Sequence, residues 1–355
     1  MHEPFGKVEV KIAVIGGGTG SFTMLNVLKD YTKRIAAIVN MADDGGSTGV
    51  LRDELGTLPP GDVRQCLVAL SDSSKIRDLF SYRFEEGTFG GHSFGNILLT
   101  ALEKTTGSFA DAVETASDIL RINGTVIPGT LDDVRLRMAW PEVSLELNGE
   151  RVIDADYFKH DPRRATLSLV PNPVPNPTAI AAIEQADLVI IAPGDLYTSL
   201  GPLLVIDGIG DALQRTQATV AYVCNLVTKA GQTAGFTVSD HAREIERFAG
   251  GRCLDYVLYN EALPSVDVAE RYKAEDAYLV TYDDAELQGV HYKAIGGRFL
   301  GGMAEAHTGD MLPVTRSLIR HDAGAVVDTL LRLYRQEVRR AASRRIRSAP
   351  VAREV

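Results

Sequence analysis

Two adjacent acidic residues, Asp43 and Asp44, stand beside a pair of glycines in the stretch ADDGGSTG. Carboxylates in this position could hold a cation such as Mg²⁺, deprotonate a hydroxyl, or accept hydrogen bonds from a ligand. Near a phosphate they would repel it unless a cation or a proton lies between. The alternative is a turn whose acidic side chains bond to their own backbone. We treat Asp43 and Asp44 as candidate catalytic or metal-binding residues, and both, with Gly46 and Ser47, as candidate ligand contacts.

A glycine-rich turn, GGGTGS at residues 16–21, follows a short apolar run and precedes apolar residues at helical spacing. Backbone N–H groups at such a helix start can hold a phosphate. The turn has the first two glycines of the GxGxxG pattern, but Ser21 replaces the last one, and the lysine of a Walker loop is missing. Taken alone, it fits a phosphate site and simple strand-to-helix packing alike. The candidate contacts are Gly17, Gly18 and Thr19.

Two further segments carry polar residues at predicted helix starts. In PPGDVR, Asp62 fits a helix N-cap better than a catalyst, while Arg64 could reach a phosphate. In GGHSFGN, the residues His92, Ser93 and Asn96 resemble an anion-binding helix start, and His92 could act as an acid or base. No GxSxG elbow is present to make Ser93 a nucleophile. All five are candidate ligand contacts.

Short apolar strands that alternate with helices must position these residues. The strands are expected at 12–15, 35–40, 187–192, 219–224, 255–259 and 278–281. The first two strands enclose a helix in a βαβ unit, which predicts parallel pairing and a right-handed crossover. Ligands of open parallel sheets bind outside the carboxyl ends of the strands. The candidate residues after these strand ends would therefore share one rim of the sheet.

The remaining segments complete a predicted α/β fold, a Rossmann-like three-layer αβα arrangement with a mostly parallel sheet. Residues 41–60 show neither a helix nor a strand period and are expected to form a long loop. Residues 134–152 alternate around Asn148-Gly149, which predicts an inserted antiparallel ribbon. Helices are expected from Asp62 and from Ser93, and at about 178–185, 201–215 and 322–347.

The predicted domain covers residues 8–330, with the insertion at about 130–170, and a basic C-terminal helix and tail at 331–355. The alternative is two domains that separate at PNPVPNP, residues 171–177. A structure with the strands at 12–15 and 187–192 in different sheets would favour that alternative.

Composition excludes several classes of protein. The chain has 355 residues, 37 basic and 47 acidic, and its net charge of −10 argues against nucleic-acid binding. Three cysteines without CxxC spacing argue against a disulfide framework or a zinc site. No signal peptide or long apolar run is visible, which predicts a cytoplasmic protein without membrane insertion. The basic stretch RRAASRRIR fits a solvated helix end, and a homo-oligomer is compatible with the sequence.

Six motifs resemble one known family when they are taken in order. They are VIGGGTG, ADDGGSTGVLR, LPPGDVRQCL, GGHSFGN, APGDLYTSL and NLVTKAGQT. This combination is similar to the family of bacterial gluconeogenesis factors and 2-phospho-L-lactate transferases, over roughly residues 10–325. The glycine pair in ADDGGSTG, together with PPGD, resembles the gluconeogenesis-factor branch more than the transferase branch.

The resemblance implies a Rossmann-like core with a nucleotide-diphosphate site on the rim. In the gluconeogenesis-factor branch the ligand is a UDP-sugar, notably UDP-N-acetylglucosamine, with roles in central carbon metabolism, cell-wall synthesis and cell shape. In the other branch a Mg²⁺-dependent enzyme transfers a phospho-acid from a nucleotide diphosphate donor. The leading hypothesis is a regulatory UDP-sugar-binding protein, and the alternative is such a transferase, with Mg²⁺ as the possible cofactor. An NAD dehydrogenase is a weaker third hypothesis, because no catalytic His–Asp pair stands out.

The resemblance also implies further ligand contacts on the rim. We expect these to be Gly194, Leu196, Tyr197, Thr198, Asn225 and Thr228, which would line the sugar or the base. Tyr272 and Arg320 resemble positions that contact UDP-sugars, by stacking and by ion pairing; the alternative is a surface Tyr and a strand-end Arg. The chain departs from the family pattern N-x-x-T-Q-P-G-E-T at Lys229, Ala230 and Gln232.

Overall fold

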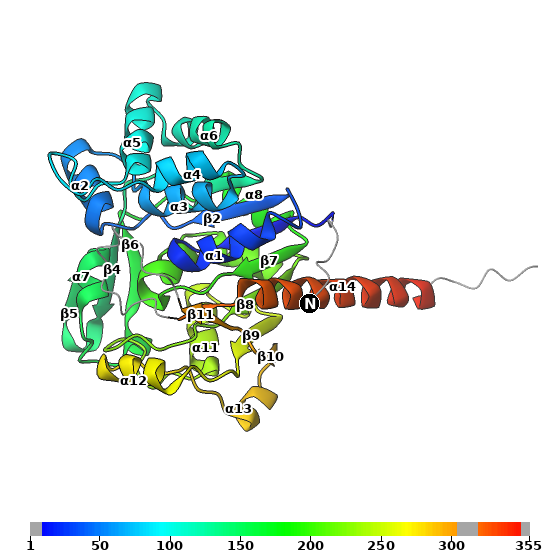
Figure 1. Ribbon diagram of the computed structural model, residues 1–355. Helices are drawn as coiled ribbons and strands as arrows, with labels where there is room; N and C mark the ends of the chain where they lie inside the picture. The colour runs from blue at the N-terminus through cyan, green and yellow to red at the C-terminus, as the bar shows by residue number, and fades with distance from the viewer. Residues whose placement is uncertain (1–8, 304–318, 349–355) are drawn as a thin grey trace, which may run out of the picture.

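The computed structural model describes residues 9–303 and 319–348 and places a seven-stranded parallel sheet at the centre of the molecule (Figure 1). The order of its strands is β10-β9-β8-β7-β1-β2-β3. Their bounds are β1 (Ile12–Ile15), β2 (Ile35–Val39), β3 (Thr125–Pro128), β7 (Leu188–Ile191), β8 (Thr219–Val223), β9 (Tyr256–Asn260) and β10 (Lys293–Gly297). β1 pairs in parallel with both β2 and β7. The predicted fold class is confirmed, whereas β3 and β10 had no sequence prediction.

Helices cover both faces of the sheet, because alternate strand residues point into two separate cores. Ala13 and Ile15 belong to the core under the first group of helices, and Ile12 and Val14 to the core under the second. The first group is α8 (Pro177–Glu184), α9 (Gly201–Leu204), α10 (Ile209–Arg215) and α11 (Val238–Phe248). The second is α1 (Gly18–Leu28), α3 (Gly61–Leu70), α4 (Ser74–Ser81), α5 (Phe94–Thr106), α6 (Phe109–Leu120) and α14 (Ala323–Ser348). The molecule therefore has the three layers that the sequence predicts.

The expected antiparallel insertion is present, but its turn is elsewhere. The small sheet consists of β4 (Arg135–Trp140), β5 (Leu145–Asn148) and β6 (Thr166–Val170), in the order β5-β4-β6. β4 turns into β5 through the short helix η1 (Pro141–Val143), so the predicted turn at Asn148-Gly149 is wrong. Gly149, with φ 93°, instead precedes α7 (Glu150–Ala155). The second short helix is η2 (Pro162–Arg164).

A helix interrupts the segment that was expected to be a loop. Within residues 41–60, α2 spans Gly46–Leu55. A Cβ on Gly49 would lie 2.0 Å from the carbonyl oxygen of Asp44, so this glycine allows the helix to pack against the acidic loop. The buried Arg52 donates to the carbonyl oxygens of Asp43 at 2.7 Å and Val134 at 2.6 Å. Of the glycines that indicated a loop, Gly49 serves close packing, whereas Gly46 and Gly56 take positive φ at the two ends of α2.

Two other predicted elements differ from the structure. The helix expected at 201–215 is divided into α9 and α10, and Gly208 takes φ 85° before α10. A further short helix, η3 (Leu196–Leu200), precedes α9. The strand expected at 278–281 is reduced to two isolated bridges, from Leu279 to Val227 and from Thr281 to Thr237. The remaining elements are α12 (Val266–Ala274), α13 (Asp284–Gln288), β11 (Leu300–Met303) and β12 (Ile319–His321).

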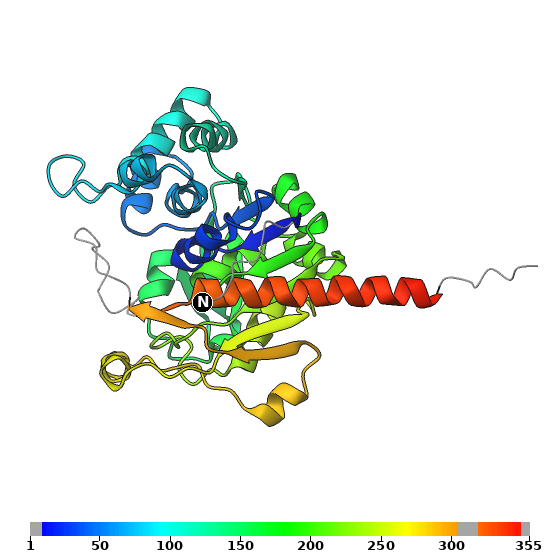
Figure 2. The same cartoon turned by 45° about the vertical axis from the view of Figure 1, so that its right-hand side comes forward.

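The helix at the C-terminus, α14, packs one end on the second core and projects from the body (Figure 2). It continues through residue 330 without a break. Residues 8 and 304–318 of the predicted domain and residues 349–355 of the predicted tail lie outside the described residues. In the part of the chain that the structure describes, no helix combines the length and the apolar character needed to cross a bilayer.

Candidate functional site

The candidate site lies at the point in the sheet where the order of the strands reverses. From β1 the chain crosses to β2 and β3 on one side, whereas β7 leads to β8 and β9 on the other. Such a switch point opens a crevice at the carboxyl ends of the two central strands. A cavity of about 520 Å³ is found there. Eight residues predicted from the sequence line it: Gly17, Gly18, Thr19, Gly194, Asn225, Thr228, Tyr272 and Arg320.

The glycine turn after β1 is enclosed on two sides. A Cβ on Gly17 would lie 2.0 Å from Oδ2 of Asp62, and one on Gly20 would lie 1.8 Å from the carbonyl oxygen of Pro193. Gly18 has φ +61°, and its N–H donates to Oδ1 of Asp62 at 2.9 Å. The predicted N-cap role of Asp62 is therefore wrong, because α3 begins at Gly61 after Pro60 and the carboxylate binds the neighbouring turn.

Asp62 and Asp43 are two half-buried acids whose pKa values are raised. Burial raises the pKa of Asp62 to about 7, and the charge of Asp43 adds to this, against the opposing effects of the Gly18 N–H and Arg64. Burial also raises the pKa of Asp43, although Gly45 donates to its Oδ1 at 2.9 Å. Groups poised in this way are typical of functional sites. The pair could exchange a proton close to the glycine turn.

Asp44 has different neighbours from Asp43. Its carboxylate accepts the backbone N–H groups of Glu150 at 3.2 Å and Arg151 at 2.7 Å, at the start of α7, and it pairs with Arg135 at 3.5 Å. An acidic group at a helix N-terminus is stabilising. Within residues 9–303 and 319–348, no group of three or more His, Cys, Asp or Glu side chains is placed to hold a metal ion. The oxygens of Asp44 are thus already hydrogen-bonded, and a metal-binding role for Asp43 and Asp44 stays a prediction.

A second set of predicted residues forms a chain of hydrogen bonds away from the cavity lining. Ser47 Oγ lies 2.9 Å from Nδ1 of His92 and accepts from Asn96 Nδ2 at 3.2 Å. Arg64 Nε donates to Oδ1 of Asn96 at 2.9 Å. Ser93 caps α5 by accepting the N–H of Asn96, as its helix-start position predicts. This chain joins α2, α3 and α5 beside the acidic loop, and Gly46 begins α2 there with φ +46°.

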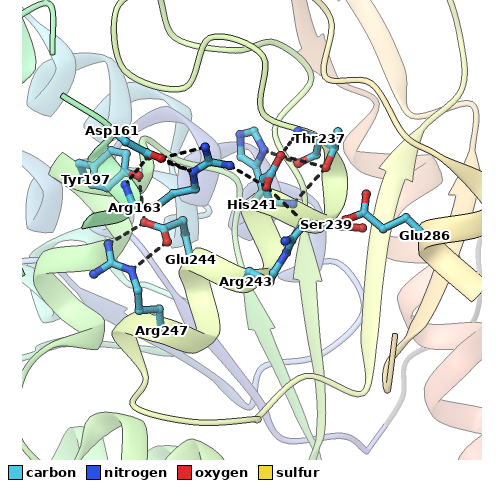
Figure 3. Close-up of polar contacts among 11 residues, drawn as sticks. Asp161, Arg163, Tyr197, Thr237, Ser239, His241, Arg243, Glu244, Arg247 and Glu286 are labelled. Carbon is cyan, nitrogen blue, oxygen red and sulfur yellow. Dashed lines mark hydrogen bonds and ion pairs between the residues drawn. The ribbon is translucent and has the colours of Figure 1, made fainter. Parts of the chain in front are cut away.

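Three predicted contacts after β7 point into the protein interior. Leu196, Tyr197 and Thr198 are buried, and none of them lines the cavity. The hydroxyl of Tyr197 donates to Oε2 of Glu244 at 2.9 Å, and Arg247 pairs with the same carboxylate at 2.6 Å (Figure 3). Tyr197 thus satisfies a buried ion pair, which is a structural role.

Arg320 and Tyr272 lie on the wall of the cavity next to β12. Tyr272 is buried, and its hydroxyl accepts the N–H of Ile319 at 2.9 Å, which positions the residue before Arg320. Arg320 Nε is buried and has no hydrogen-bond partner among the described residues. Buried donors are nearly always paired in folded proteins. Arg320 therefore offers an unsatisfied donor at a cavity wall.

Sequence reasoning missed several cavity residues. Lys229 forms ion pairs with Asp154 and with Asp195, and all three line the cavity. Asp195 stands in the motif APGDLYTSL and Lys229 in NLVTKAGQT, so a signal for both existed. Asp154 lies in the insertion, where no motif marked it. His321 also lines the cavity; its Nε2 lies 3.0 Å from the carbonyl oxygen of Cys224, and burial lowers its pKa to about 4.

Comparison with known proteins gives consistent matches along most of the chain. The family model for 2-phospho-L-lactate transferase CofD matches residues 12–300. The gluconeogenesis factor of Bacillus subtilis (strain 168) is 37% identical over 330 residues, which cover 92% of this chain and 98% of that protein. A Nostoc sp. relative is 46% identical over 278 residues, or 77% of this chain; the chain spans only 60% of that relative's length. A UPF0052 family structure from Bacillus halodurans superposes with a TM-score of 0.81 at 34% identity, covering 91% of this chain and all of that one.

Proposed function

Because the chain belongs to the family of gluconeogenesis factors and 2-phospho-L-lactate transferases, we propose that it binds a UDP-sugar of the UDP-N-acetylglucosamine class. The binding site would be the cavity at the carboxyl ends of β1 and β7. We further propose that this binding serves regulation, in central carbon metabolism, cell-wall synthesis and cell shape. A cytoplasmic location remains the prediction made from the sequence.

The observation that carries this proposal is the guanidinium group of Arg320, which lies on the cavity wall and whose buried Nε has no hydrogen-bond partner among the described residues. A diphosphate is the natural partner of such a group, because guanidinium donors match phosphate oxygens in charge and geometry. Gly17 and Thr19 line the same cavity, so their backbone N–H groups could receive the diphosphate from another side, whereas the N–H of Gly18 donates to Asp62. Tyr272 adds an aromatic ring that could contact the uracil.

Calorimetric titration with UDP-N-acetylglucosamine, GDP and NAD tests the proposal. We expect only the uridine ligand to bind tightly, and at 100 times its dissociation constant it should stabilise the fold by about 2.7 kcal/mol. R320A should weaken binding at least tenfold, whereas R34A, which removes an exposed arginine, should leave it unchanged. Wild-type protein that responds to no uridine diphosphate would contradict the proposal.

A second candidate function is transfer of a phospho-acid from a nucleotide diphosphate donor. It is favoured by the half-buried acids Asp43 and Asp62 near the glycine turn, because a carboxylate with a raised pKa can take a proton from an acceptor hydroxyl. The test is turnover of a GDP-linked or UDP-linked donor with an added acceptor, with and without Mg²⁺. Turnover that D43N abolishes, with donor affinity retained, would favour the transferase over the regulator.

A further inference from the structure

A lysine stands between two carboxylates on the wall of the cavity. Lys229, from the loop after β8, places its Nζ 2.8 Å from Oδ2 of Asp195 and in contact with Oδ1 of Asp154. Asp195 follows β7, and Asp154 belongs to α7 of the insertion. The side chains are only partly exposed, at 18% for Lys229 and Asp154 and 36% for Asp195. Three separate elements therefore meet at one ammonium group.

The loop that carries Lys229 holds it in this direction. The N–H of Lys229 donates to Oγ1 of Thr233 at 2.8 Å, and its carbonyl accepts the N–H of Thr233 at 2.9 Å. Gln232 is buried and donates from Nε2 to the carbonyl oxygens of Ile153 at 2.8 Å and Asp154 at 3.1 Å. A glutamate at position 232 has no donor for these carbonyls when ionised. Lys229 and Gln232 thus bind the same end of α7.

The charges on the cavity wall show what Lys229 contributes. The described lining carries four acidic side chains, those of Asp154, Asp156, Asp195 and Glu275, against the two cations Lys229 and Arg320. Two carboxylates that converge on one point repel each other unless a proton, a metal ion or a basic side chain lies between them. The four acids and two cations leave a net charge of −2 on the lining, and loss of the Lys229 charge would make it −3 and repel a diphosphate more strongly.

We propose that Lys229 is a built-in cation that occupies the position of a divalent metal between Asp154 and Asp195, so that this part of the cavity binds its anionic ligand without a metal ion. The choice of ligand rests on the proposed function, whereas the role of Lys229 as a positioning residue does not. Oxygen ligands at this point suit Mn²⁺ or Mg²⁺. The hydroxyl of Thr198, 3.5 Å from Oδ1 of Asp154, could add a further oxygen.

The first test uses Mn²⁺ alone as the probe, added to full-length protein after treatment with EDTA and followed by electron paramagnetic resonance. Wild type and K229R should bind no Mn²⁺ at this position, whereas K229Q should gain one site that K229Q/D195N lacks. K293Q is the matched control, because Lys293 pairs with Glu337 and does not line the cavity. Equal Mn²⁺ binding by wild type and K229Q, or none by K229Q, would overturn the proposal.

Stability and nucleotide binding provide independent readouts. If K229Q does not fold in EDTA, the double variant K229Q/D195N should fold, because it removes the repulsion between the two carboxylates. A double variant that does not fold either would show that Lys229 only holds the three elements together. UDP-N-acetylglucosamine should bind wild type equally with and without EDTA, and K229Q at least tenfold more weakly in EDTA, with recovery on adding Mn²⁺. Wild type that binds no nucleotide would refute the proposed function, while the Mn²⁺ result would still decide the role of Lys229.

Discussion

Replacement of Asp62 by asparagine should stabilise the protein at neutral pH, by an amount that depends on pH. The side chain is half-buried, and the pKa of its carboxyl group is raised from 3.8 to about 7, first by burial and then by the charge of Asp43. Between these two values the folded protein holds a proton that the unfolded chain has released. Stability therefore falls as the pH rises from about 4 to about 7, and stays low above that.

The size of the effect follows from the pKa change. One pKa unit corresponds to about 1.4 kcal/mol, so the Asp62 carboxyl lowers the free energy of unfolding by on the order of 4 kcal/mol above pH 7. Asparagine has nearly the same shape, and its amide oxygen can still accept the N–H of Gly18. The substitution removes the buried charge and leaves this contact in place.

The assay is urea unfolding of wild type and D62N at pH 5, 6, 7 and 8. The stability difference should grow in favour of D62N up to pH 7 and then level off. For E150Q, the gain in stability over wild type should still be growing between pH 7 and pH 8, because burial and then the charge of Asp43 raise the pKa of Glu150 to about 9. D78N, on the exposed side of α4, controls for the loss of one negative charge. A D62N difference that is the same at every pH would refute the reasoning.

Three further substitutions test the packing of the site. G20A should lower stability by about 3 kcal/mol and weaken nucleotide binding in calorimetry, because the added Cβ would lie 1.8 Å from the carbonyl oxygen of Pro193. R52M should lower the free energy of unfolding by about 3 kcal/mol in urea, since it removes charged hydrogen bonds to buried carbonyls. Y197F should lower it by about 1–3 kcal/mol and leave nucleotide affinity unchanged, because the hydroxyl donates to Glu244 in the core and Tyr197 does not line the cavity.

Matched controls make each of these outcomes specific. G302A adds a Cβ at a position with no atom of the described residues within 4 Å. R34M removes an exposed arginine, and Y278F removes a hydroxyl that bonds to an exposed aspartate. Each control should change stability by less than about 0.5 kcal/mol. If G20A behaves like G302A, α1 can move away from the rim loop. If Y197F weakens nucleotide binding, the hydroxyl of Tyr197 contributes to the nucleotide site as well as to the core.

The parallel core could be predicted because its strands can be recognised from their local sequence. Ile12 to Ile15 and Leu188 to Ile191 are continuous apolar runs, and each is followed by glycine and polar residues. Strands buried on both faces have this composition. The sequence therefore locates the rim, and eight of the predicted residues do line the cavity. The edge strand β10, with two glycines among its five residues, lacks that composition.

Other features depended on contacts between distant segments, which local patterns do not contain. Gly49 looks like a loop residue until the backbone of Asp44 is placed 2.0 Å from its absent Cβ. Asp154 lies in an insertion with no motif of its own, and only the folded chain brings it to Lys229. A residue without a local signal becomes visible as part of a site only when its partner is known.

The motif residues divide into those that line the cavity and those that shape it, and a sequence pattern marks both in the same way. Gly17 lines the cavity, yet its lack of a side chain is required by Asp62, which stands behind the turn and holds the N–H of Gly18. Tyr197 belongs to a motif after β7, although its hydroxyl stabilises a buried ion pair. Both kinds of position tolerate little change, because a turn displaced by an ångström no longer presents the same donors. Loss of binding in a motif variant therefore identifies a contact only if stability is unchanged, as we expect for Arg320 and not for Gly20.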